Sequence, residues 1–150
     1  MSVNEVDGAF VKPDLTLLGK EHVKKYQETD GEIGHIWNGV TTLLLTTLGN
    51  KSGQWRTTPL IYACNGNEYL VIASKGGAPS HPAWYLNLQA CPEAQIQVKD
   101  KKLKVKARTA TESERDSRWK IMSDQWPNYE QYAQRTTRKI PVVILEPIEA

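Results

Sequence analysis

Two short loops rich in glycine carry the residues best suited to hold an anion. The first loop runs from Gly49 to Arg56 and contains two cations, Lys51 and Arg56, together with the hydroxyl of Ser52. Its glycines allow a tight turn that exposes backbone N–H groups, and such nests bind phosphates when cations stand beside them. A hairpin loop with solvated charges has the same composition, so both interpretations stay open at this point.

The second loop runs from Ser74 to Pro82 and leads into a short helix expected over residues 83–89. Proline suits the start of a helix, and the N–H groups of a helix N-terminus attract anions. Lys75 adds a positive charge, and the paired glycines after it let a ligand approach the backbone closely. Two such loops at the ends of neighbouring strands indicate an anion site more strongly than either loop alone.

Aromatic side chains follow both loops along the chain. Trp84 and Leu88 are spaced i and i+4, and they either form the core face of the short helix or present Trp84 to a ligand. Trp126, Tyr129 and Tyr132 recur every three residues, so on a helix they share a broad face. They belong either to the core or to a half-exposed wall against which a flat conjugated ligand can stack.

The chain offers few groups that perform chemistry unaided. No Ser-His-Asp arrangement, G-x-S-x-G elbow or G-x-G-x-x-G dinucleotide motif stands out in the sequence. His22, His35 and His81 are scattered without the spacing of a metal site, so no metal is expected. Cys64 and Cys91 are expected to be reduced structural thiols. The pattern favours chemistry supplied by a bound cofactor, which the protein binds and orients.

The elements that must position these loops are mostly strands. Strands are expected over residues 40–48, 57–63, 68–74, 93–100, 102–108 and 140–146, and helices over 15–28, 83–89, 111–123 and 127–135. Pro59 implies an edge, a bulge or an unpaired position in the second strand. Asn65 and Gly66 predict a type I′ turn before the third strand. Thr111 and Glu114 form a capping-box pattern at the start of the third helix.

The order of these elements predicts an α+β fold. Six mostly sequential strands joined by hairpins favour an antiparallel sheet that curls or closes, with helices packed outside it. Strands and helices do not alternate as they do in a doubly wound parallel sheet. At 150 residues the chain is expected to form a single domain, with residues 1–14 flexible.

Charge and hydropathy argue against a nucleic-acid-binding protein, a membrane-spanning protein and a secreted protein. The net charge of +2 is too small to indicate nucleic-acid binding. The basic run from Lys99 to Lys106 alternates with apolar residues, which is typical of the solvated face of a half-buried strand. No segment approaches the roughly 18 apolar residues of a membrane-spanning helix. The first residues lack the apolar stretch of a secretory signal, so a cytoplasmic protein without stable membrane contact is expected.

Three longer segments resemble one known family. They are TTLGNKSGQWRTTPLIY, YLVIASKGGAPSHPAWYLNL and RKIPVVILEP, and they closely resemble the deazaflavin-dependent nitroreductases of actinobacteria over about residues 34–147. The resemblance implies a split β-barrel related to that of flavin reductases. It also implies reduced coenzyme F420 as the cofactor, a 5-deazaflavin with a phosphodiester and an oligoglutamate tail. Members of the family reduce quinones, nitro compounds and activated alkenes such as enones and coumarin-like lactones.

The resemblance further implies which residues hold the cofactor. The first loop would bind the phosphate and the acidic tail, with Lys51 and Arg56 as its main cations. The strand ends and the short helix would line the deazaflavin, and Tyr129 would close the pocket from above. The implied cofactor-binding residues are Leu44, Leu45, Thr46, Asn50, Lys51, Ser52, Gly53, Gln54, Trp55, Arg56, Ile72, Ala73, Ser74, Lys75, Ala83, Trp84, Tyr85, Leu86, Asn87 and Tyr129.

The implied reaction delivers a hydride to an electrophilic carbon, after which negative charge develops on a carbonyl or nitro oxygen of the substrate. Ser74, Tyr129 and Tyr132 are the candidate catalytic residues, as hydrogen-bond donors to that oxygen. Trp126, Tyr129 and Tyr132 are the candidate substrate-binding residues. Nitroreductases of the family tend to carry tyrosine at the first of these positions. Trp126 therefore favours smaller enones or lactones over bicyclic nitroimidazoles.

Other readings remain open at the level of the sequence. The same barrel can bind FMN, but the pair Lys51 and Arg56 favours F420, because an acidic tail uses two cations more fully than one phosphate does. A non-catalytic carrier of F420 would need the same cofactor-binding residues. A barrel that binds nucleic acid is a further alternative, and the basic hairpin is the only feature that favours it. The expected partner is a small electrophilic substrate, and a monomer is favoured over a homodimer.

Overall fold

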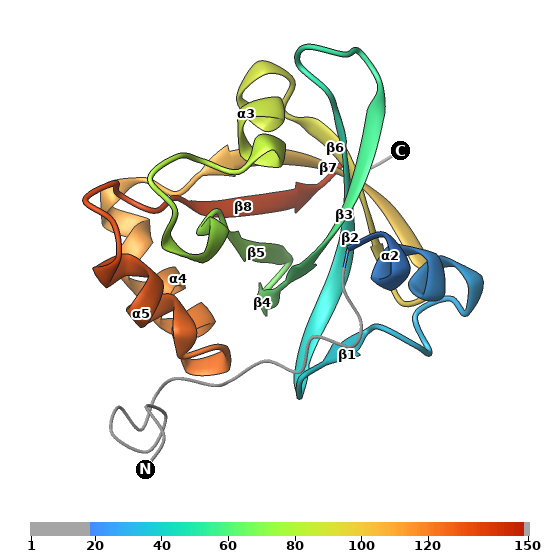
Figure 1. The fold of residues 1–150 in the computed structure, drawn as a ribbon, viewed down its shortest axis with the longest axis horizontal. Coiled ribbons are helices and arrows are strands. Elements are labelled where there is room, and N and C mark those ends of the chain that lie inside the picture. The colour runs from blue at the N-terminus through green and yellow to red at the C-terminus, as the bar shows by residue number, and fades with distance from the viewer. Residues whose placement is uncertain (1–18, 149–150) are drawn as a thin grey trace.

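The computed structural model describes residues 19–148, so the expected flexible segment and the first residues of the expected first helix lie outside the described part. In chain order the elements are α2 (Gly19–Glu28), β1 (Ile36–Trp37), β2 (Val40–Leu48), β3 (Trp55–Ile61), β4 (Ala63–Asn65), β5 (Glu68–Ile72), the 3-10 turn η1 (Lys75–Gly77), α3 (Ala83–Ala90), β6 (Glu93–Val98), β7 (Lys101–Thr109), α4 (Glu112–Gln125), α5 (Asn128–Gln134) and β8 (Val142–Pro147). Figure 1 shows α4 and α5 together on one side of the strands and α2 on the other.

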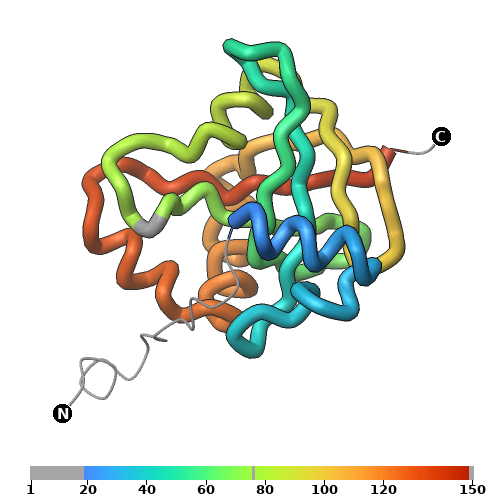
Figure 2. The backbone as a smooth tube through the Cα atoms, turned by 45° about the vertical axis from the view of Figure 1, so that its right-hand side comes forward, coloured from blue at the N-terminus to red at the C-terminus, as the bar shows by residue number. Residues whose placement is uncertain are grey.

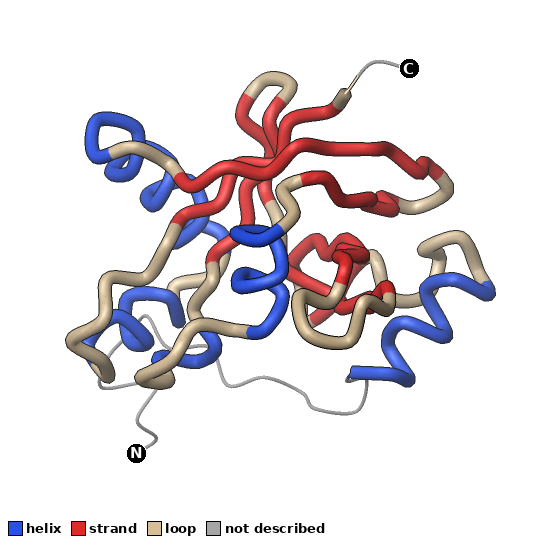
Figure 3. The backbone as a smooth tube through the Cα atoms, turned by 90° about the horizontal axis from the view of Figure 1, so that it is seen from above, coloured by secondary structure: helices blue, strands red, loops and turns tan. Residues whose placement is uncertain are grey.

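All paired strands are antiparallel, and they form one curled sheet. Its order is β1-β2-β6-β7-β8-β5-β4, and β3 also pairs with β2. At Tyr62 the chain bends from β3, which pairs with β2, into β4, which pairs with β5. The bend links the two ends of the sheet, as closure of a barrel requires. The expected α+β fold with a curled antiparallel sheet is confirmed, and the helices lie around the strands (Figure 3).

The hairpin of β2 and β3 is the longest in the sheet. Leu48 pairs with Trp55 at its tip, and the connecting loop carries the first basic segment. Figure 2 shows this hairpin rising beyond the rest of the barrel beside α3. Pro59 lies in β3, whose single strand partner among the described residues is β2, so the expected edge position is confirmed.

The turn between β4 and β5 differs from expectation. Asn65 pairs with Glu68, so the two central residues are Gly66 and Asn67. Only Gly66 of these two has a positive φ, of 62°. A type I′ turn needs positive φ at both central positions, so the expected type I′ turn at Asn65 and Gly66 is wrong. The glycine at the first central position is the pattern of a type II′ turn.

Alternate side chains of β5 and β8 enter two separate cores. Val71 and Leu145 belong to a cluster inside the barrel with the buried leucines of β2. Leu70 and Ile144 belong to a second cluster that packs beneath α4 and α5. Because successive residues of a strand point to opposite faces, both faces are buried here. This explains why these two strands are almost unbroken apolar runs.

Candidate active site

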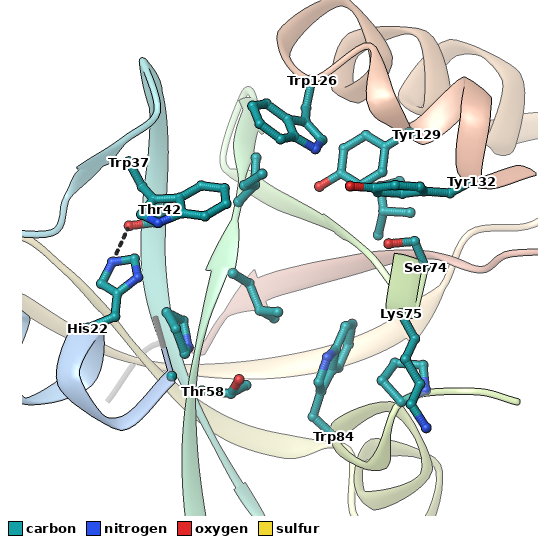
Figure 4. A pocket seen from close by; sticks show the side chains of 16 residues that line it. His22, Trp37, Thr42, Thr58, Ser74, Lys75, Trp84, Trp126, Tyr129 and Tyr132 are labelled. Atoms are coloured by element: carbon teal, nitrogen blue, oxygen red, sulfur yellow. Dashed lines mark hydrogen bonds between the residues drawn. The ribbon is translucent and has the colours of Figure 1, made fainter. Parts of the chain in front are cut away.

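A cavity of about 480 Å³ opens between α2, β3, the end of β5, the start of α3 and the junction of α4 with α5. Ligand sites for small molecules commonly occupy about 300–1,000 Å³. Six aromatic side chains line it, and they come from segments far apart in the sequence (Figure 4): His22, Trp37, Trp84, Trp126, Tyr129 and Tyr132. The cavity therefore offers flat apolar walls to a conjugated ligand.

The end of β5 contributes the polar group nearest to the candidate chemistry. Ser74 is buried at the cavity wall and its hydroxyl points into the open space (Figure 4). Lys75 follows with a φ of 48°, a left-handed backbone conformation that is uncommon outside glycine. Its Nζ donates a hydrogen bond to Ser80 Oγ at 3.4 Å. The structure thus brings Ser74 and Lys75 to the same wall, where the sequence places its second basic loop.

Arg138 fixes the shape of this second loop, and the sequence analysis gave it no role. Its guanidinium donates to three backbone carbonyls, those of Ala73 at 3.1 Å, Ser74 at 2.7 Å and Ala78 at 3.1 Å. It also lies 2.8 Å from His81 Nδ1, which accepts from it. Burial lowers the pKa of Arg138, and burial and the charge of Arg138 lower the pKa of His81. One arginine in the polar run from Gln134 to Lys139 carries no sequence signal for such a role.

A glycine lets the loop pack against the helix α5. A Cβ on Gly77 would lie 2.5 Å from the carbonyl oxygen of Tyr132 and 2.9 Å from Cβ of Arg135. Its φ of 84° also disfavours any side chain. Because the loop packs so closely against α5, the position of Ser74 depends on the position of the helix that carries Tyr129 and Tyr132.

The junction of α4 and α5 provides the aromatic wall, although its three members do not share one helix face. Trp126 is the C-cap of α4, while Tyr129 and Tyr132 lie on α5. The expectation of one helical face is therefore wrong, because Pro127 separates the two helices. All three residues nevertheless line the cavity, and both tyrosine hydroxyls point into it (Figure 4). Burial, with a smaller effect of Tyr132, raises the pKa of Tyr129, which stays protonated at neutral pH.

The opposite wall comes from residues that the sequence analysis did not assign to a site. His22 of α2 and Trp37 of β1 stack with a ring-centroid distance of 6.5 Å and an interplanar angle of 22°. Trp37 in turn lies 5.7 Å from the ring of Trp126. The lone buried histidine of a short helix is more often structural than functional, so only the tertiary structure shows that it faces the cavity.

Most backbone N–H groups of the loop at the tip of the β2–β3 hairpin already have a hydrogen-bond partner, unlike those of an anion-binding nest. The N–H groups of Gly49, Gly53 and Gln54 bond within the loop, to Gln54 O, Gly49 O and Ser52 Oγ. The N–H of Asn50 donates to Asn87 Oδ1 of α3 at 3.0 Å. The side chains of Lys51 and Arg56 are exposed. The loop therefore offers cations more than free backbone donors.

Several residues implied to contact the cofactor lie away from the cavity. Leu45, Ala73 and Tyr85 are buried in the barrel core, and Leu44 and Thr46 point to the outer face of β2. Asn87 is buried between α3 and the hairpin, where it also donates to Thr47 Oγ1 at 3.1 Å. Ala83 and Leu86 are exposed on α3, as is Trp55 on the hairpin. Of the implied cofactor set, Ile72, Ser74, Lys75, Trp84 and Tyr129 line the cavity.

The described residues contain neither a metal-ligand cluster nor a membrane-spanning helix. Among residues 19–148 no cluster of three or more His, Cys, Asp or Glu side chains is placed to hold a metal ion. No described helix is long and apolar enough to span a membrane. The cytoplasmic location and the single domain stay predictions.

Comparisons with known proteins agree on one family. A sequence model of the F420H(2)-dependent quinone reductase family matches residues 18–147. An F420H(2)-dependent quinone reductase of Mycobacterium tuberculosis H37Rv is 44% identical over 128 residues, which cover 83% of this chain and 86% of the relative. The match extends over most of both proteins and includes both basic loops.

Two solved structures with 42% identity support the same assignment. One, described as an F420-H2 dependent reductase (FDR-A), has a TM-score of 0.65 and covers 70% of this chain and 93% of its own. The other, described as a domain-swapped dimer, has a TM-score of 0.66, and the match covers 70% of this chain and 79% of that structure's chain. These comparisons give no support to a preference for a monomer. They confirm the split-barrel fold and the resemblance, and the chain belongs to the F420H(2)-dependent quinone reductase family, with reduced coenzyme F420 as its cofactor.

Proposed function

We propose that this enzyme transfers a hydride from reduced coenzyme F420 to quinones bound in the aromatic cavity. The observation that carries the proposal is the family match over residues 18–147, which contains every described residue that lines the cavity. The cavity adds independent support, because its aromatic walls suit flat conjugated rings.

The residues present fit the cofactor. Its phosphodiester and oligoglutamate tail are anionic, and the chain offers three exposed cations: Lys75 of η1, which lines the cavity, and Lys51 and Arg56 on the hairpin loop. Asn87 ties the hairpin loop to α3, whose Trp84 lines the cavity, so the loop and the aromatic walls are held together. The deazaflavin ring would lie against Trp84, Ile72 and the edge strand β3.

The cofactor-binding residues implied by the resemblance remain our proposal, in two groups. Side chains contact the ring at Ile72, Ser74, Lys75, Trp84 and Tyr129. The residues Asn50 to Arg56 contact the phosphate and the tail, mainly through Lys51 and Arg56. The buried residues Leu44, Leu45, Ala73, Tyr85 and Asn87 and the half-buried Thr46 shape the site through packing and backbone, and Ala83 and Leu86 flank it on α3.

The cofactor supplies a hydride, and the protein supplies orientation and hydrogen bonds. Ser74, Tyr129 and Tyr132 direct their hydroxyls into the same space, where they can donate to an oxygen on which negative charge develops. Each such bond strengthens as charge grows in the transition state, so it lowers the barrier more than it tightens substrate binding. The side chains of Trp126 and Tyr129 form the walls of the space that would hold the substrate ring.

The shape of the wall bears on substrate choice. Trp126 is large and buried, its ring lies 5.7 Å from that of Trp37, and it lines the cavity. We propose that quinones are the main substrates and that small enones and coumarin-like lactones react as well. Bicyclic nitroimidazoles would react poorly, because their second ring meets this wall.

Anaerobic turnover of reduced F420 tests the proposal. Oxidation of the deazaflavin is followed with a naphthoquinone, a cyclohexenone, a coumarin and a bicyclic nitroimidazole as alternative acceptors. We expect the largest kcat/KM for the quinone and the smallest for the nitroimidazole. Substituting Trp126→Tyr should raise the relative rate with the nitroimidazole. No turnover with any quinone would contradict the proposal.

A further inference from the structure

A buried histidine forms part of the cavity wall opposite Ser74 and Tyr132 (Figure 4). His22 is 3% exposed and comes from α2, whereas the hydroxyl donors come from β5 and α5. The cavity therefore presents polar groups at two opposite ends, with aromatic rings between them. The function proposed above uses the groups of one end only.

The ring of His22 is held in one orientation. Its Nε2 lies 2.8 Å from the carbonyl oxygen of Gly34, which can only accept a hydrogen bond, so Nε2 carries a proton and donates it. The Cδ2–Nε2 edge faces Gly34, where a Cβ would lie 3.0 Å from Cδ2. Nδ1 is on the opposite edge of the ring, which faces the cavity (Figure 4). Stacking against Trp37 fixes the plane of the ring.

Reduction of a quinone to a hydroquinone takes up one hydride and one proton. The hydroxyls of Ser74, Tyr129 and Tyr132 are suited to donate hydrogen bonds, but they are weak acids, and burial raises the pKa of Tyr129 further. Histidine is the side chain that ordinarily exchanges a proton near neutral pH. Among the described residues that line the cavity, His22 is the only histidine.

We infer that His22 donates the proton in quinone reduction, an assignment that rests on the function proposed above. The hydride and its electron pair would pass from the reduced cofactor to a ring carbon of the quinone. That hydrogen then leaves as a proton to solvent as the ring becomes aromatic, and the far oxygen takes up a proton from solvent. The Nδ1–H bond of the imidazolium breaks, and an O–H bond forms on the quinone oxygen nearest His22. The quinone gains two electrons and becomes a hydroquinone. Neutral His22 keeps its Nε2–H bond to Gly34, and a proton from solvent restores the imidazolium.

The two-ended arrangement also accounts for a preference for quinones. The two oxygens of a para-quinone lie at opposite ends of its ring. The hydroxyls of Ser74 and Tyr132 lie at one end of the cavity, and His22 lies at the other (Figure 4). An enone has one carbonyl oxygen and uses one end of the cavity at a time. His22 is thus a catalytic residue and also a determinant of specificity.

The variant His22→Gln tests this role, because glutamine places an amide N–H near the position of Nε2 and nothing at that of Nδ1. We expect it to bind F420 within twofold of the wild type and to lose about 100-fold in kcat/KM for a naphthoquinone, as removal of a general acid does. The matched control is His35→Gln. His35 is half-buried and bonds Tyr62 Oη at 3.0 Å, but it does not line the cavity, so its variant should keep wild-type activity.

Chemical rescue separates proton donation from a structural role. Imidazole added to His22→Ala should restore quinone reduction in proportion to the imidazolium concentration, without changing the Kd for F420. A His22→Gln rate within threefold of the wild type would overturn the assignment. So would a slow His22→Ala that binds F420 normally yet does not respond to imidazole. A wild-type enzyme that reduces no quinone would overturn the proposed function, and this inference with it.

Discussion

At the scale of single residues, the end of the cavity at Ser74 concentrates hydroxyl groups that donate hydrogen bonds without exchanging protons. Tyr129 is the clearest case, because it is 5% exposed and its hydroxyl points into the cavity. Burial raises its pKa, so the phenol stays protonated across the physiological range. Its expected contribution is a hydrogen bond to developing negative charge, which is a transition-state effect.

Removing that hydroxyl tests the contribution directly. Tyr129→Phe should lower kcat/KM for a quinone about tenfold, which corresponds to about 1.4 kcal/mol of barrier. The Kd for F420 should stay within twofold, because the ring that packs in the wall is kept. Steady-state kinetics and a fluorescence titration measure the two quantities. Tyr69→Phe is the control, because Tyr69 packs half-buried against the barrel core and does not line the cavity. Equal losses in both variants would refute the role.

The sequence pattern predicts some of the residues that line the cavity and misses others. Ser74, Lys75, Trp84 and the tyrosines are brought together, because each lies at a strand end or helix start whose position the local pattern already indicates. His22 and Trp37 join them from the first described elements only through the fold. No spacing rule connects α2 to α5, since the cavity that both line depends on how the sheet curls.

At the scale of elements, one arginine joins the segment before β8 to the loop after β5. Arg138→Lys keeps a positive charge but loses the planar group that reaches three carbonyls. We expect the free energy of unfolding to fall by about 2 kcal/mol and the KM for F420 to rise, since Ser74 and Lys75 lose their support. Urea unfolding and steady-state kinetics measure these changes.

The neighbouring lysine supplies the control for that experiment. Lys139 makes an exposed ion pair with Glu112, and such pairs contribute little to stability. Lys139→Gln should therefore leave both the unfolding midpoint and the KM unchanged. If Arg138→Lys behaved like Lys139→Gln, the loop would not depend on the guanidinium.

A second link between elements is the ion-pair network that fastens α4 to the sheet. Arg108 of β7 donates to both carboxylate oxygens of Glu114, at 2.7 and 2.9 Å, and also pairs with Glu146 of β8. The hydrogen bonds from Arg108 lower the pKa of Glu114 to about 2, and the Thr111 N–H assists. Glu114 also completes the capping box of α4, so one carboxylate serves the helix start and the sheet together.

The network makes stability depend on pH in a predictable direction. The folded pKa of Glu114, about 2, lies below the ordinary value of 4.5. Its stabilising contribution is therefore complete above about pH 4.5 and is lost as pH falls toward 2. The difference in melting temperature between the wild type and Glu114→Gln should be largest near pH 6 and shrink by pH 3. A difference that stays constant would contradict the assignment, and Glu21→Gln, exposed on α2, is the control.

The local sequence predicts where helices and strands begin and end better than it predicts how these elements contact one another. The capping box, the edge proline and the long strand β2 all appear where their residue patterns place them. The single strand expected over residues 57–63 is instead two, because the bend at Tyr62 is imposed by pairing with two different partners. Such a bend has no local signature, and it is the feature that closes the barrel.

At the scale of the whole molecule, we propose that a few exposed cations serve the cofactor, while the net charge is only +2. Lys75 lines the cavity, and Lys51 and Arg56 are exposed on the hairpin loop that Asn87 ties to α3. Exposed cations act on an anionic ligand through solvent, so their effect is screened by salt. The affinity for F420 should then depend on ionic strength, while the affinity for its deazaflavin riboside, which lacks phosphate and tail, should not.

A double substitution tests this distribution. Lys51→Gln with Arg56→Gln should raise the Kd for F420 about tenfold at low salt, if each cation contributes of order 0.5–1 kcal/mol. It should also flatten the salt dependence between roughly 0.05 and 0.5 M. Tryptophan fluorescence reports binding, because Trp84 lines the cavity. The control replaces Lys104 and Lys106 on the exposed face of β7, and an equal effect there would show that only net charge matters.

The central claim is that hydride passes from reduced F420 to a quinone within this cavity. A single-turnover experiment tests it most directly: the enzyme saturated with reduced F420 is mixed rapidly and anaerobically with a naphthoquinone. We predict that one equivalent of deazaflavin is oxidised and one equivalent of hydroquinone formed per site, far faster than without enzyme and more slowly in Tyr129→Phe. Oxidation at the rate seen without enzyme, or turnover only when FMN replaces F420, would contradict the account.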